Sequence, residues 1–439
     1  MPTGKKGTLA YNRHLNQRIL LAWHPIQASQ QAGAAIRRGR QGALPSVWSR
    51  GRPGGMGPAN NGLPSQELAH MSKRPVVVYG ANGFSGRLIV EFLREYNTPF
   101  IAAGRSAAKI KQVTDHVPGI ETADFEIMET SGTLDDLVRI FEGAKVVCNT
   151  AGPFIYNGPL VIEAALKAGC HYIDIGGEQA WIREVADNWG EKFRERSLLA
   201  APATAFMCAV SDASARLCLE SGAIDTLETV TMFKGIPTFG STQTIFAVIQ
   251  TDAYYLEQNQ YKAWPRATRY DVNIPGYLQT QLALAWGGFP QPVWFKNHSQ
   301  IANVRSMGGL LDRQIMEGVA ATEKMFEEQI RPLPKAEREK KLAEMANAVQ
   351  GGTPPRENPR EQRTIDVVVG RGSTDYAQCV VFGTCCYRQT GLLQAFAAHH
   401  LAHAAPRNTG FVSPAAAFGH REILRVLEEH GLAKVRLTH

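Results

Sequence analysis

The chain has 439 residues, of which 44% are hydrophobic and 20% are charged, and its formal net charge is +7. A chain of this length and composition is neither fibrous nor disordered throughout, and it is long enough for two domains with a sizeable core. No apolar run approaches the roughly 18 to 20 residues that a membrane-spanning helix needs. We therefore expect no membrane span.

The positive charge lies at one end of the chain. Residues 1–70 contain nine lysines and arginines and one acidic residue, so this segment carries +8 and the rest of the chain carries −1. A nucleic-acid partner needs a basic face on the folded part of a protein. Because the rest of the chain is nearly neutral, the sequence predicts no nucleic-acid partner.

Residues 1–72 are predicted to form a disordered basic extension, because they are rich in Gly, Pro, Gln, Ala and Arg and show little apolar periodicity. Two interpretations compete. An Arg-rich, acid-poor segment resembles a mitochondrial presequence; alternatively, Met71 is the natural start of the protein. The glycines and prolines of residues 51–64 are unsuited to a targeting helix. We therefore favour the second interpretation and a cytoplasmic location, with a mitochondrial location as the alternative.

The spacing of cysteines and histidines indicates neither disulfides nor a metal. The seven cysteines are odd in number, scattered and without a C-x-x-C pair, which is untypical of a disulfide framework or a zinc site. His399 and His403 would share one face of a helix, but no acidic third ligand lies near them in the sequence. We expect a reducing compartment and no metal site.

A short β-branched run at 76–79 breaks into three glycines and then into an apolar pattern at helical spacing. This order predicts a strand, a tight turn and a helix. Gly80 suits the turn, Gly83 lets the backbone approach a pyrophosphate, and Gly86 lets the helix pack onto the strand. The N–H groups of the first helical turn attract phosphate. The predicted cofactor-binding residues of this segment are Gly80, Asn82, Gly83, Phe84, Ser85 and Gly86.

From residue 74 onward, short β runs alternate with helical patterns. This alternation predicts an α/β protein with a doubly wound parallel sheet, the Rossmann architecture, over residues 73–205. The expected strands are 76–79, 99–104, 124–128, 145–150, 171–175 and 198–202.

After about residue 205 the alternation changes, which predicts a second, α+β domain with a mixed sheet over residues 206–390, for substrate binding and dimerisation. Its expected strands are 227–234, 293–305, 364–370 and 376–388, the last two as a hairpin. Residues 306–362 are predicted to be an exposed helical insertion that ends in a Gly/Pro-rich linker. The insertion suits a lid or a contact in a homodimer, or it is a plain solvated face.

The second strand ends in Gly104, Arg105 and Ser106. An NAD site usually presents an acidic residue here to the ribose, whereas Arg105 with the Ser106 hydroxyl suits the 2′-phosphate of NADP. The alternative is a surface arginine at the start of a helix. The position favours NADP(H) as the cofactor.

The fourth strand opens into a loop beyond its carboxyl end, where doubly wound sheets bind their ligands. We predict that this loop borders the nicotinamide, although an ordinary turn is the alternative. The residues concerned are Asn149, Thr150, Ala151, Gly152, Pro153 and Phe154.

Polar residues crowd the end of the fifth strand. Asp174 lies on the strand, and Glu178 follows two glycines and is expected to point freely into a cleft. Either of these, or Tyr156, is a candidate proton donor or substrate-orienting residue. Capping of the following helix is the competing structural role.

Four segments together resemble the saccharopine dehydrogenase-like oxidoreductases, a family that also holds trans-acting enoyl reductases. They are residues 80–86, residues 103–105, residues 149–154 with Gly158, and residues 171–178. The resemblance implies an NADP(H)-binding Rossmann domain, a second mixed-sheet domain for the substrate, and final helices within 391–439 that return to the first domain.

The residues and the resemblance together predict an NADP(H)-dependent oxidoreductase. It would transfer a hydride to or from a C=N or C=C bond of a small-molecule substrate, since the cofactor carries the hydride and the protein binds, orients and supplies a proton. The alternative is a non-catalytic NADP-binding or regulatory protein with the same architecture.

Overall fold

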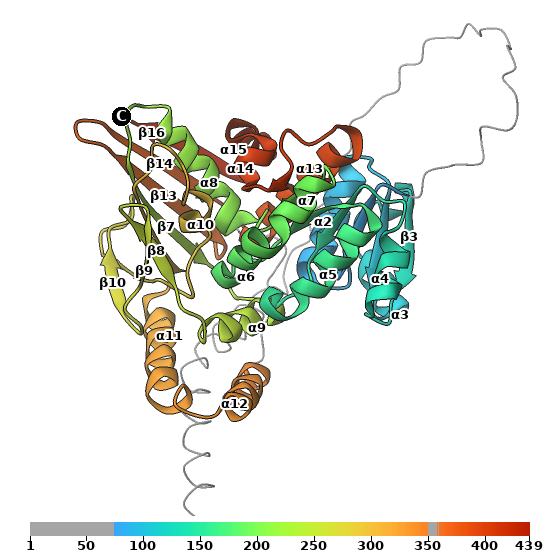
Figure 1. Ribbon diagram of the computed structural model, residues 1–439, viewed down its shortest axis with the longest axis horizontal. Helices are drawn as coiled ribbons and strands as arrows, with labels where there is room; N and C mark the ends of the chain where they lie inside the picture. The colour runs from blue at the N-terminus through green and yellow to red at the C-terminus, as the bar shows by residue number, and fades with distance from the viewer. Residues whose placement is uncertain (1–73, 350–357, 359) are drawn as a thin grey trace, which may run out of the picture.

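The computed structural model describes residues 74–349, 358 and 360–439. The predicted N-terminal extension and most of the predicted linker lie outside these residues. The described chain forms two sheets with helices around and between them (Figure 1). The first sheet carries the blue N-terminal strands, and the second lies at the opposite side of the molecule.

Seven parallel strands form the first sheet, and their order reverses between the first and fourth strands, as in a doubly wound fold. Val76 and Val78 point into one apolar core and Val77 into another. Both faces are thus buried, which explains the continuous apolar strands. The predicted fold class is confirmed. In spatial order the strands are β15 (Gly410–Phe411), β6 (Leu199–Ala201), β5 (His171–Asp174), β4 (Val146–Asn149), β1 (Val76–Tyr79), β2 (Phe100–Gly104) and β3 (Phe125–Glu129).

Helices cover both faces of the first sheet. They are α2 (Phe84–Glu95), α3 (Ala107–Thr114), η1 (Ile120–Thr122), α4 (Leu134–Phe141), α5 (Phe154–Ala168), α6 (Gln179–Glu184), η2 (Val185–Trp189), α7 (Gly190–Glu195) and α13 (Cys386–His403). α2 and α13 pack against each other in the core that contains Val76 and Val78. α4 and α5 pack in the core that contains Val77.

The second sheet is mixed, as predicted. β12 and β7 are parallel, whereas the other neighbours are antiparallel, and β13 and β14 form the predicted hairpin. In spatial order its strands are β10 (Arg269–Val272), β11 (Gln281–Leu284), β12 (Asn303–Leu310), β7 (Thr226–Lys234), β13 (Arg363–Arg371), β14 (Tyr376–Gly383) and β16 (Ala433–Thr438), with β8 (Tyr254–Glu257) paired to β12 and to β9 (Gln260–Ala263).

Two predicted strands have other boundaries in the structure. The strand expected at 293–305 begins only at Asn303, because the short helix α10 (Gln291–Trp294) precedes it, so residues 306–310 of the predicted helical insertion are strand. The strand expected at 376–388 ends at Gly383, and Cys386 begins α13. In the second place an apolar run crosses from strand to helix, and apolar composition alone does not distinguish the two.

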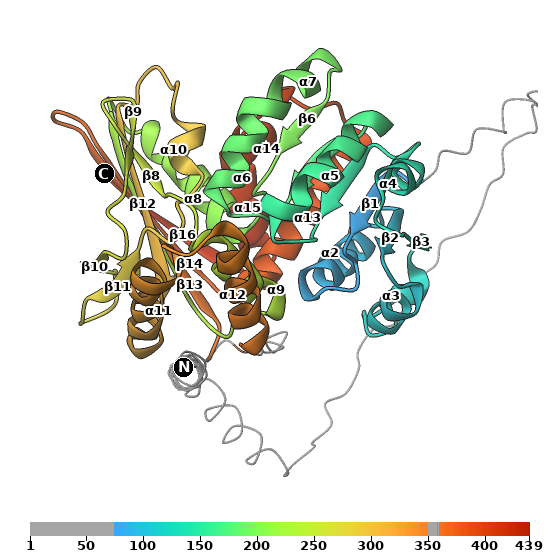
Figure 2. The same ribbon diagram turned by 60° about the horizontal axis from the view of Figure 1, so that its bottom comes forward.

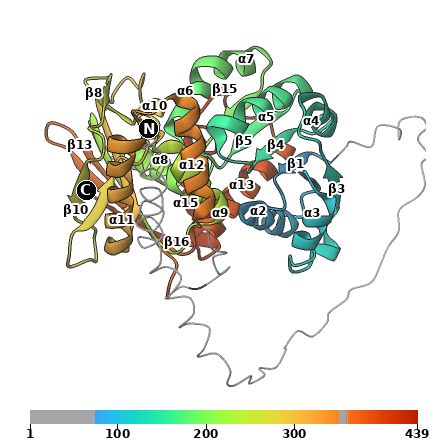
Figure 3. The same cartoon turned by 90° about the horizontal axis from the view of Figure 1, so that it is seen from below.

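The helical insertion comprises α11 (Arg313–Met325), η3 (Phe326–Ile330) and α12 (Lys335–Ala348). Its apolar side chains, among them Phe326 and Leu342, pack against Phe246 of α9 (Phe239–Val248). Figure 2 shows α11 beside β10 and β11. From below, α9 and α12 lie between the second sheet and α2 (Figure 3). The insertion is therefore packed on one side rather than solvated all round.

α8 (Phe206–Leu219) follows β6 and packs against β13 and β14, and also against α14 (Pro414–Phe418) and α15 (His420–Glu429). The C-terminal segment adds β15 to the first sheet and β16 to the second. This segment therefore joins both domains. In the described part of the chain, none of the helices is long and apolar enough to cross a membrane.

Candidate functional site

The turn between β1 and α2 is shaped by its glycines. Gly80 has a φ of +89°, and a Cβ atom there would collide with the Thr150 hydroxyl. A Cβ atom at Gly86 would lie 2.5 Å from the Gly80 carbonyl oxygen, so α2 could not stay packed onto β1. Only glycine tolerates both the backbone conformation and the close approach.

The N-terminus of α2 suits an anion. Its N-cap residue is Gly83, which has no capping side chain, and the first turn contains no acidic residue. The N–H groups there and the positive end of the helix dipole are available to a phosphate. Asn82, Gly83, Phe84, Ser85 and Gly86 also line a cavity. These residues therefore fit the pyrophosphate of a dinucleotide.

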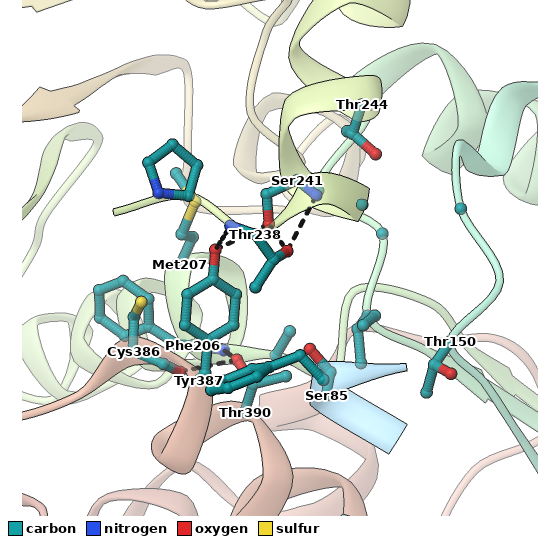
Figure 4. Close-up of a pocket in the computed structure, with 18 of the residues that line it drawn as sticks. Ser85, Thr150, Phe206, Met207, Thr238, Ser241, Thr244, Cys386, Tyr387 and Thr390 are labelled. Carbon is teal, nitrogen blue, oxygen red and sulfur yellow. Dashed lines mark hydrogen bonds between the residues drawn. The ribbon is translucent and has the colours of Figure 1, made fainter. Parts of the chain in front are cut away.

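The cavity has a volume of about 680 Å³ and lies between the two domains. The first domain lines it with the N-terminus of α2 and the segments after β4 and β5. The second domain lines it with the segment before α9, α9 itself and residues 286–289, and the N-termini of α8 and α13 complete it. In Figure 4 the Tyr387 hydroxyl points towards Thr238 and Ser241, and Ser85 and Thr150 lie to its right.

The loop after β4 contributes only part of its length to the cavity. Thr150, Gly152 and Phe154 line it. Asn149 is instead fully buried: its side-chain amide donates to the Tyr172 hydroxyl at 3.0 Å, and its side-chain oxygen accepts the Ala151 N–H at 3.0 Å. Asn149 therefore shapes the loop. The other two residues predicted to border the nicotinamide, Ala151 and Pro153, are not among the lining residues.

Asp174 is fully buried and its carboxylate is surrounded by donors. One oxygen accepts the Tyr172 hydroxyl at 2.9 Å and the Trp181 indole N–H at 2.7 Å, and the other accepts the Gly176 and Ala203 N–H groups at 2.9 and 2.8 Å. Burial raises the pKa of Asp174, although these four hydrogen bonds act against the rise. Asp174 does not line the cavity. We call Asn149, Tyr172, Asp174 and Trp181 the β5 cluster.

Glu178 does not point freely into a cleft, contrary to the prediction. It is 1% exposed, and its two carboxylate oxygens accept the N–H groups of Phe154 and Ile155, each at 2.7 Å. These are the first N–H groups of α5, so Glu178 caps this helix from a different segment. Burial raises the pKa of Glu178 to about 7, against the effect of the two hydrogen bonds.

Tyr156 is the third predicted candidate, and it lies on the surface of α5. Its side chain is 54% exposed, and its hydroxyl accepts a hydrogen bond from the Gln250 side chain. It is not among the residues that line the cavity. The structure therefore brings none of the three predicted proton donors into the cavity.

Arg105 and Ser106 come directly after the carboxyl end of β2, which is the neighbour of β1 in the first sheet. Arg105 is exposed, and Ser106 caps α3 by accepting the Lys109 N–H at 3.4 Å. Neither residue lines the cavity. They occupy the position at which a doubly wound fold presents a residue to the adenosine ribose.

Three hydroxyl groups that were not predicted as site residues meet at the cavity: those of Thr238, Ser241 and Tyr387, here called the hydroxyl cluster. The Tyr387 oxygen accepts the Thr238 N–H at 2.9 Å and lies 2.8 Å from Ser241 Oγ. The hydroxyl oxygens of Thr238 and Ser241 are 3.0 Å apart. Tyr387 is 146 residues from Ser241 in the sequence, so no local pattern could bring it to this position.

The cavity is poor in charge. Among the lining residues of the described chain, Arg87 is the only charged one, and it lies in the first turn of α2. Large apolar side chains form much of the wall, among them Phe154, Phe206, Phe233, Val248, Trp286 and Phe289. An unpaired charge is costly in such surroundings. The part of the cavity beyond α2 therefore suits an uncharged, largely apolar molecule.

Comparison with known proteins identifies two stretches of the chain. Residues 76–194 match the saccharopine dehydrogenase NADP binding domain. Residues 209–438, more than half of the chain, match a family of unknown function, DUF5938. The NADP-binding match contains the Gly-rich turn and the ends of β4 and β5.

Several relatives are similar to part of this chain. A lipid droplet localized protein of Caenorhabditis elegans is 32% identical over 136 residues, which are 29% of this chain and 32% of that protein. A trans-acting enoyl reductase of Mycobacterium ulcerans is 32% identical over 118 residues, 26% of this chain and 27% of that protein. A saccharopine dehydrogenase-like oxidoreductase of Homo sapiens is 28% identical over 140 residues, 28% of this chain and 32% of that protein. The chain thus matches about a third of the length of these relatives.

Among solved structures, the apo saccharopine dehydrogenase (L-Glu forming) of Saccharomyces cerevisiae is similar over both domains. The TM-score is 0.54 at 10% identity, over 84% of this chain and 100% of that one. At this identity the likeness concerns the fold alone. With the match over residues 76–194, it confirms the predicted resemblance to the saccharopine dehydrogenase-like oxidoreductases.

Proposed function

The chain belongs to DUF5938, a family of unknown function, and on this premise we propose that it is an NADP(H)-dependent oxidoreductase acting on a C=C or C=N bond of a small substrate. Residues 76–194 of its first domain match the saccharopine dehydrogenase NADP binding domain, which supports NADP(H) as the cofactor. One observation carries the proposal. The N-terminus of α2, the segments after β4 and β5, and the hydroxyl cluster all open into one cavity.

The residues at the first domain fit the parts of the cofactor. The backbone N–H groups of residues 84–86 would hold the pyrophosphate, with Arg87 beside it, and Arg105 with Ser106 would hold the 2′-phosphate. Thr150, Gly152 and Phe154 would border the nicotinamide. When bound, NADP(H) supplies or accepts the hydride, which no protein side chain can do. The chain's own residues bind and orient the two reactants, and the apolar wall excludes water.

A first experiment tests the cofactor. Arg105→Ala should weaken NADPH binding by about tenfold or more, because a hydrogen bond to a charged group contributes roughly 1.5–3 kcal/mol, while NADH binding should stay the same. Lys109→Ala is the matched control, since Lys109 is an exposed cation one turn further along α3. Calorimetric titration with both cofactors measures the effect. Equal weakening of NADPH and NADH would remove the 2′-phosphate assignment.

A second experiment separates the enzyme from a non-catalytic NADP-binding protein. Purified protein is incubated with NADPH and panels of enoyl, imine and carbonyl compounds, and the loss of NADPH absorbance is followed. Oxidation with at least one panel supports the proposed enzyme. Tight NADPH binding without oxidation would favour a binding or regulatory protein, and absence of NADPH binding would exclude both.

A further inference from the structure

We propose that Tyr387, held by Thr238 and Ser241, donates a proton to the carbonyl oxygen of an uncharged α,β-unsaturated carbonyl substrate in the cavity. The inference rests on the proposed function and names the proton donor and the substrate class of the same site. It follows from the position of the hydroxyl cluster, from its hydrogen bonds and from the charge of the cavity wall.

The position of the hydroxyl cluster sets it apart from the three proton donors that the sequence predicted. Thr238, Ser241 and Tyr387 all line the cavity, whereas Asp174, Glu178 and Tyr156 do not. The Tyr387 ring meets the Phe84 ring edge to face, with the ring centres 5.3 Å apart, and Phe84 is the first residue of α2. Tyr387 therefore stands next to the phosphate-binding turn, on the side of the second domain.

The hydrogen bonds of the cluster leave a proton for a ligand. The Thr238 N–H donates to the Tyr387 oxygen, and the Ser241 N–H donates to the Thr238 hydroxyl oxygen at 3.1 Å, so neither contact uses a hydroxyl proton. Two hydroxyl-to-hydroxyl contacts, Tyr387 with Ser241 and Ser241 with Thr238, use two of the three hydroxyl protons. When Thr238 donates to Ser241 and Ser241 donates to Tyr387, the remaining proton is that of Tyr387, and it is available to an oxygen atom in the cavity.

Tyr387 is the member of the cluster best able to give up that proton. A phenol is far more acidic than the alcohols of serine and threonine. Burial raises the pKa of the Tyr387 phenol, so the group is protonated at neutral pH, and the contacts with Ser241 and Thr238 act in the opposite direction by favouring the phenolate. These contacts, together with the N-terminus of α9, would stabilise the negative charge that forms when the proton leaves.

The cavity wall points to an uncharged substrate. Reduction of an imine proceeds through a cationic iminium group, and an amino-acid substrate adds a carboxylate. The described lining has no acidic residue that could face a cationic iminium group. Its single cation, Arg87, lies where the pyrophosphate would bind and is therefore not free to pair with a substrate carboxylate. Desolvating an unpaired charge is costly. A conjugated carbonyl has no charge to desolvate, and its oxygen can accept the tyrosine proton.

The reaction balances with NADPH as the reductant. With NADPH as the hydride source, a new C–H bond would form at the β-carbon, the C=C pair would become the double bond between the α-carbon and the carbonyl carbon, and the C=O π pair would move to the oxygen, which takes the Tyr387 proton. The resulting enol returns to the carbonyl form when its α-carbon takes up a proton and its hydroxyl releases one. Solvent reprotonates Tyr387 through Ser241 and Thr238. One NADPH and one proton are consumed for each C=C bond reduced.

Tyr387→Phe is the direct test, because it removes the hydroxyl and keeps the ring against Phe84. With trans-2-octenoyl-N-acetylcysteamine and NADPH, we expect kcat to fall about 100-fold or more and the Kd for NADPH to stay within about twofold. Tyr156→Phe is the matched control and should leave both unchanged. Ser241→Ala keeps the tyrosine but removes its hydroxyl partner Ser241, and should lower kcat about fivefold.

Binding provides a measurement that does not depend on turnover. The saturated thioester, octanoyl-N-acetylcysteamine, should bind the NADP⁺ complex about tenfold more weakly in Tyr387→Phe than in the wild type, by calorimetry, because one hydrogen bond to its carbonyl is lost. Equal binding, together with a kcat within threefold of wild type, would overturn the role of Tyr387. Loss of NADPH affinity in Tyr387→Phe would also overturn it, since the hydroxyl would then serve the cofactor.

The substrate class has its own test. The charged cyclic imine Δ1-pyrroline-2-carboxylate should be reduced at least about 100-fold more slowly than the octenoyl thioester. Faster reduction of the imine would overturn the substrate class while leaving the oxidoreductase itself in place. The proposed function itself fails only if the wild type does not bind NADPH, or if it oxidises NADPH with none of the enoyl, imine and carbonyl panels.

Discussion

The β5 cluster and the hydroxyl cluster are both made of hydrogen-bonded polar side chains beside the same cavity, but only one of them faces it. In the β5 cluster, Asp174 accepts four hydrogen bonds from the protein and is fully buried. In the hydroxyl cluster, Tyr387 lines the cavity. The first cluster holds the strand ends together, and the second is open to a ligand.

The difference shows that a polar residue at a strand end is not thereby a site residue. Asp174 and Glu178 stand at the edge where doubly wound folds bind ligands, yet the acceptor capacity of Asp174 is met by protein donors and Glu178 caps α5. A buried carboxylate needs such partners to be tolerated at all. A polar residue here is structural when its hydrogen bonds are all made within the protein and it does not reach the cavity. A polar residue that lines the cavity can act on a ligand.

The largest expected effect comes from breaking the β5 cluster. Asp174→Ala leaves the Tyr172 hydroxyl, the Trp181 indole and two backbone N–H groups without their acceptor in a buried region. We expect the free energy of unfolding to fall by about 3–5 kcal/mol. Urea unfolding followed by circular dichroism measures this change.

The control for this variant is Asp135→Ala, which removes an exposed carboxylate from the first turn of α4 and should cost no more than about 1 kcal/mol. If Asp174→Ala is as stable as the control and has nevertheless lost activity, Asp174 belongs to the chemistry. In that case the contrast between the two clusters does not hold.

The sequence predicts features that depend on local residues, but not contacts that depend on how the elements pack. The Gly80–Gly86 turn and the doubly wound sheet follow from local rules: glycine where the backbone needs it, and apolar runs buried on both faces. Glu178 was placed in the right region but with the wrong orientation, because its partners are the first N–H groups of α5, 24 and 23 residues earlier. Such contacts depend on how the elements pack, and local spacing does not contain them.

The position of Tyr387 was also beyond what local sequence patterns could predict. The residues before it read as a continuous apolar run, which led to a predicted strand across 376–388, whereas the structure begins a helix at Cys386. Residues 238–241 are the start of α9 in the structure, and Thr238 is a typical N-cap residue. Its meeting with a tyrosine from α13 follows only from the packing of α13 against α2 beside the second domain.

A smaller effect concerns Glu178 and sharpens its role as a cap. Its pKa in the folded protein is about 7, compared with an ordinary value of 4.5. As the pH rises from about 4.5 to 7, the unfolded chain releases this proton first, so the folded state becomes less stable over this range, by up to about 3 kcal/mol, and changes no further above it. Glu178→Gln should lack this decline.

The measurement is the free energy of unfolding at several pH values between 5 and 8 for both proteins. Glu323 also has a pKa raised to about 7 by burial, so Glu323→Gln serves as a second variant that removes a titration of the same sign far from α5. Parallel curves for the wild type and Glu178→Gln would mean that Glu178 titrates normally. It would then be more exposed than a buried cap allows.

The smallest expected effect belongs to Tyr156→Phe. This tyrosine is 54% exposed, and the change removes only a hydrogen bond with Gln250 at the surface. Exposed hydrogen bonds of this kind contribute little because water replaces the lost partner, so the free energy of unfolding should change by less than about 0.5 kcal/mol. We expect kcat/KM to stay within about twofold of the wild type. A tenfold loss would place a second hydroxyl in the reaction, at the surface between α5 and α9, and proton donation could then not be assigned to the hydroxyl cluster alone.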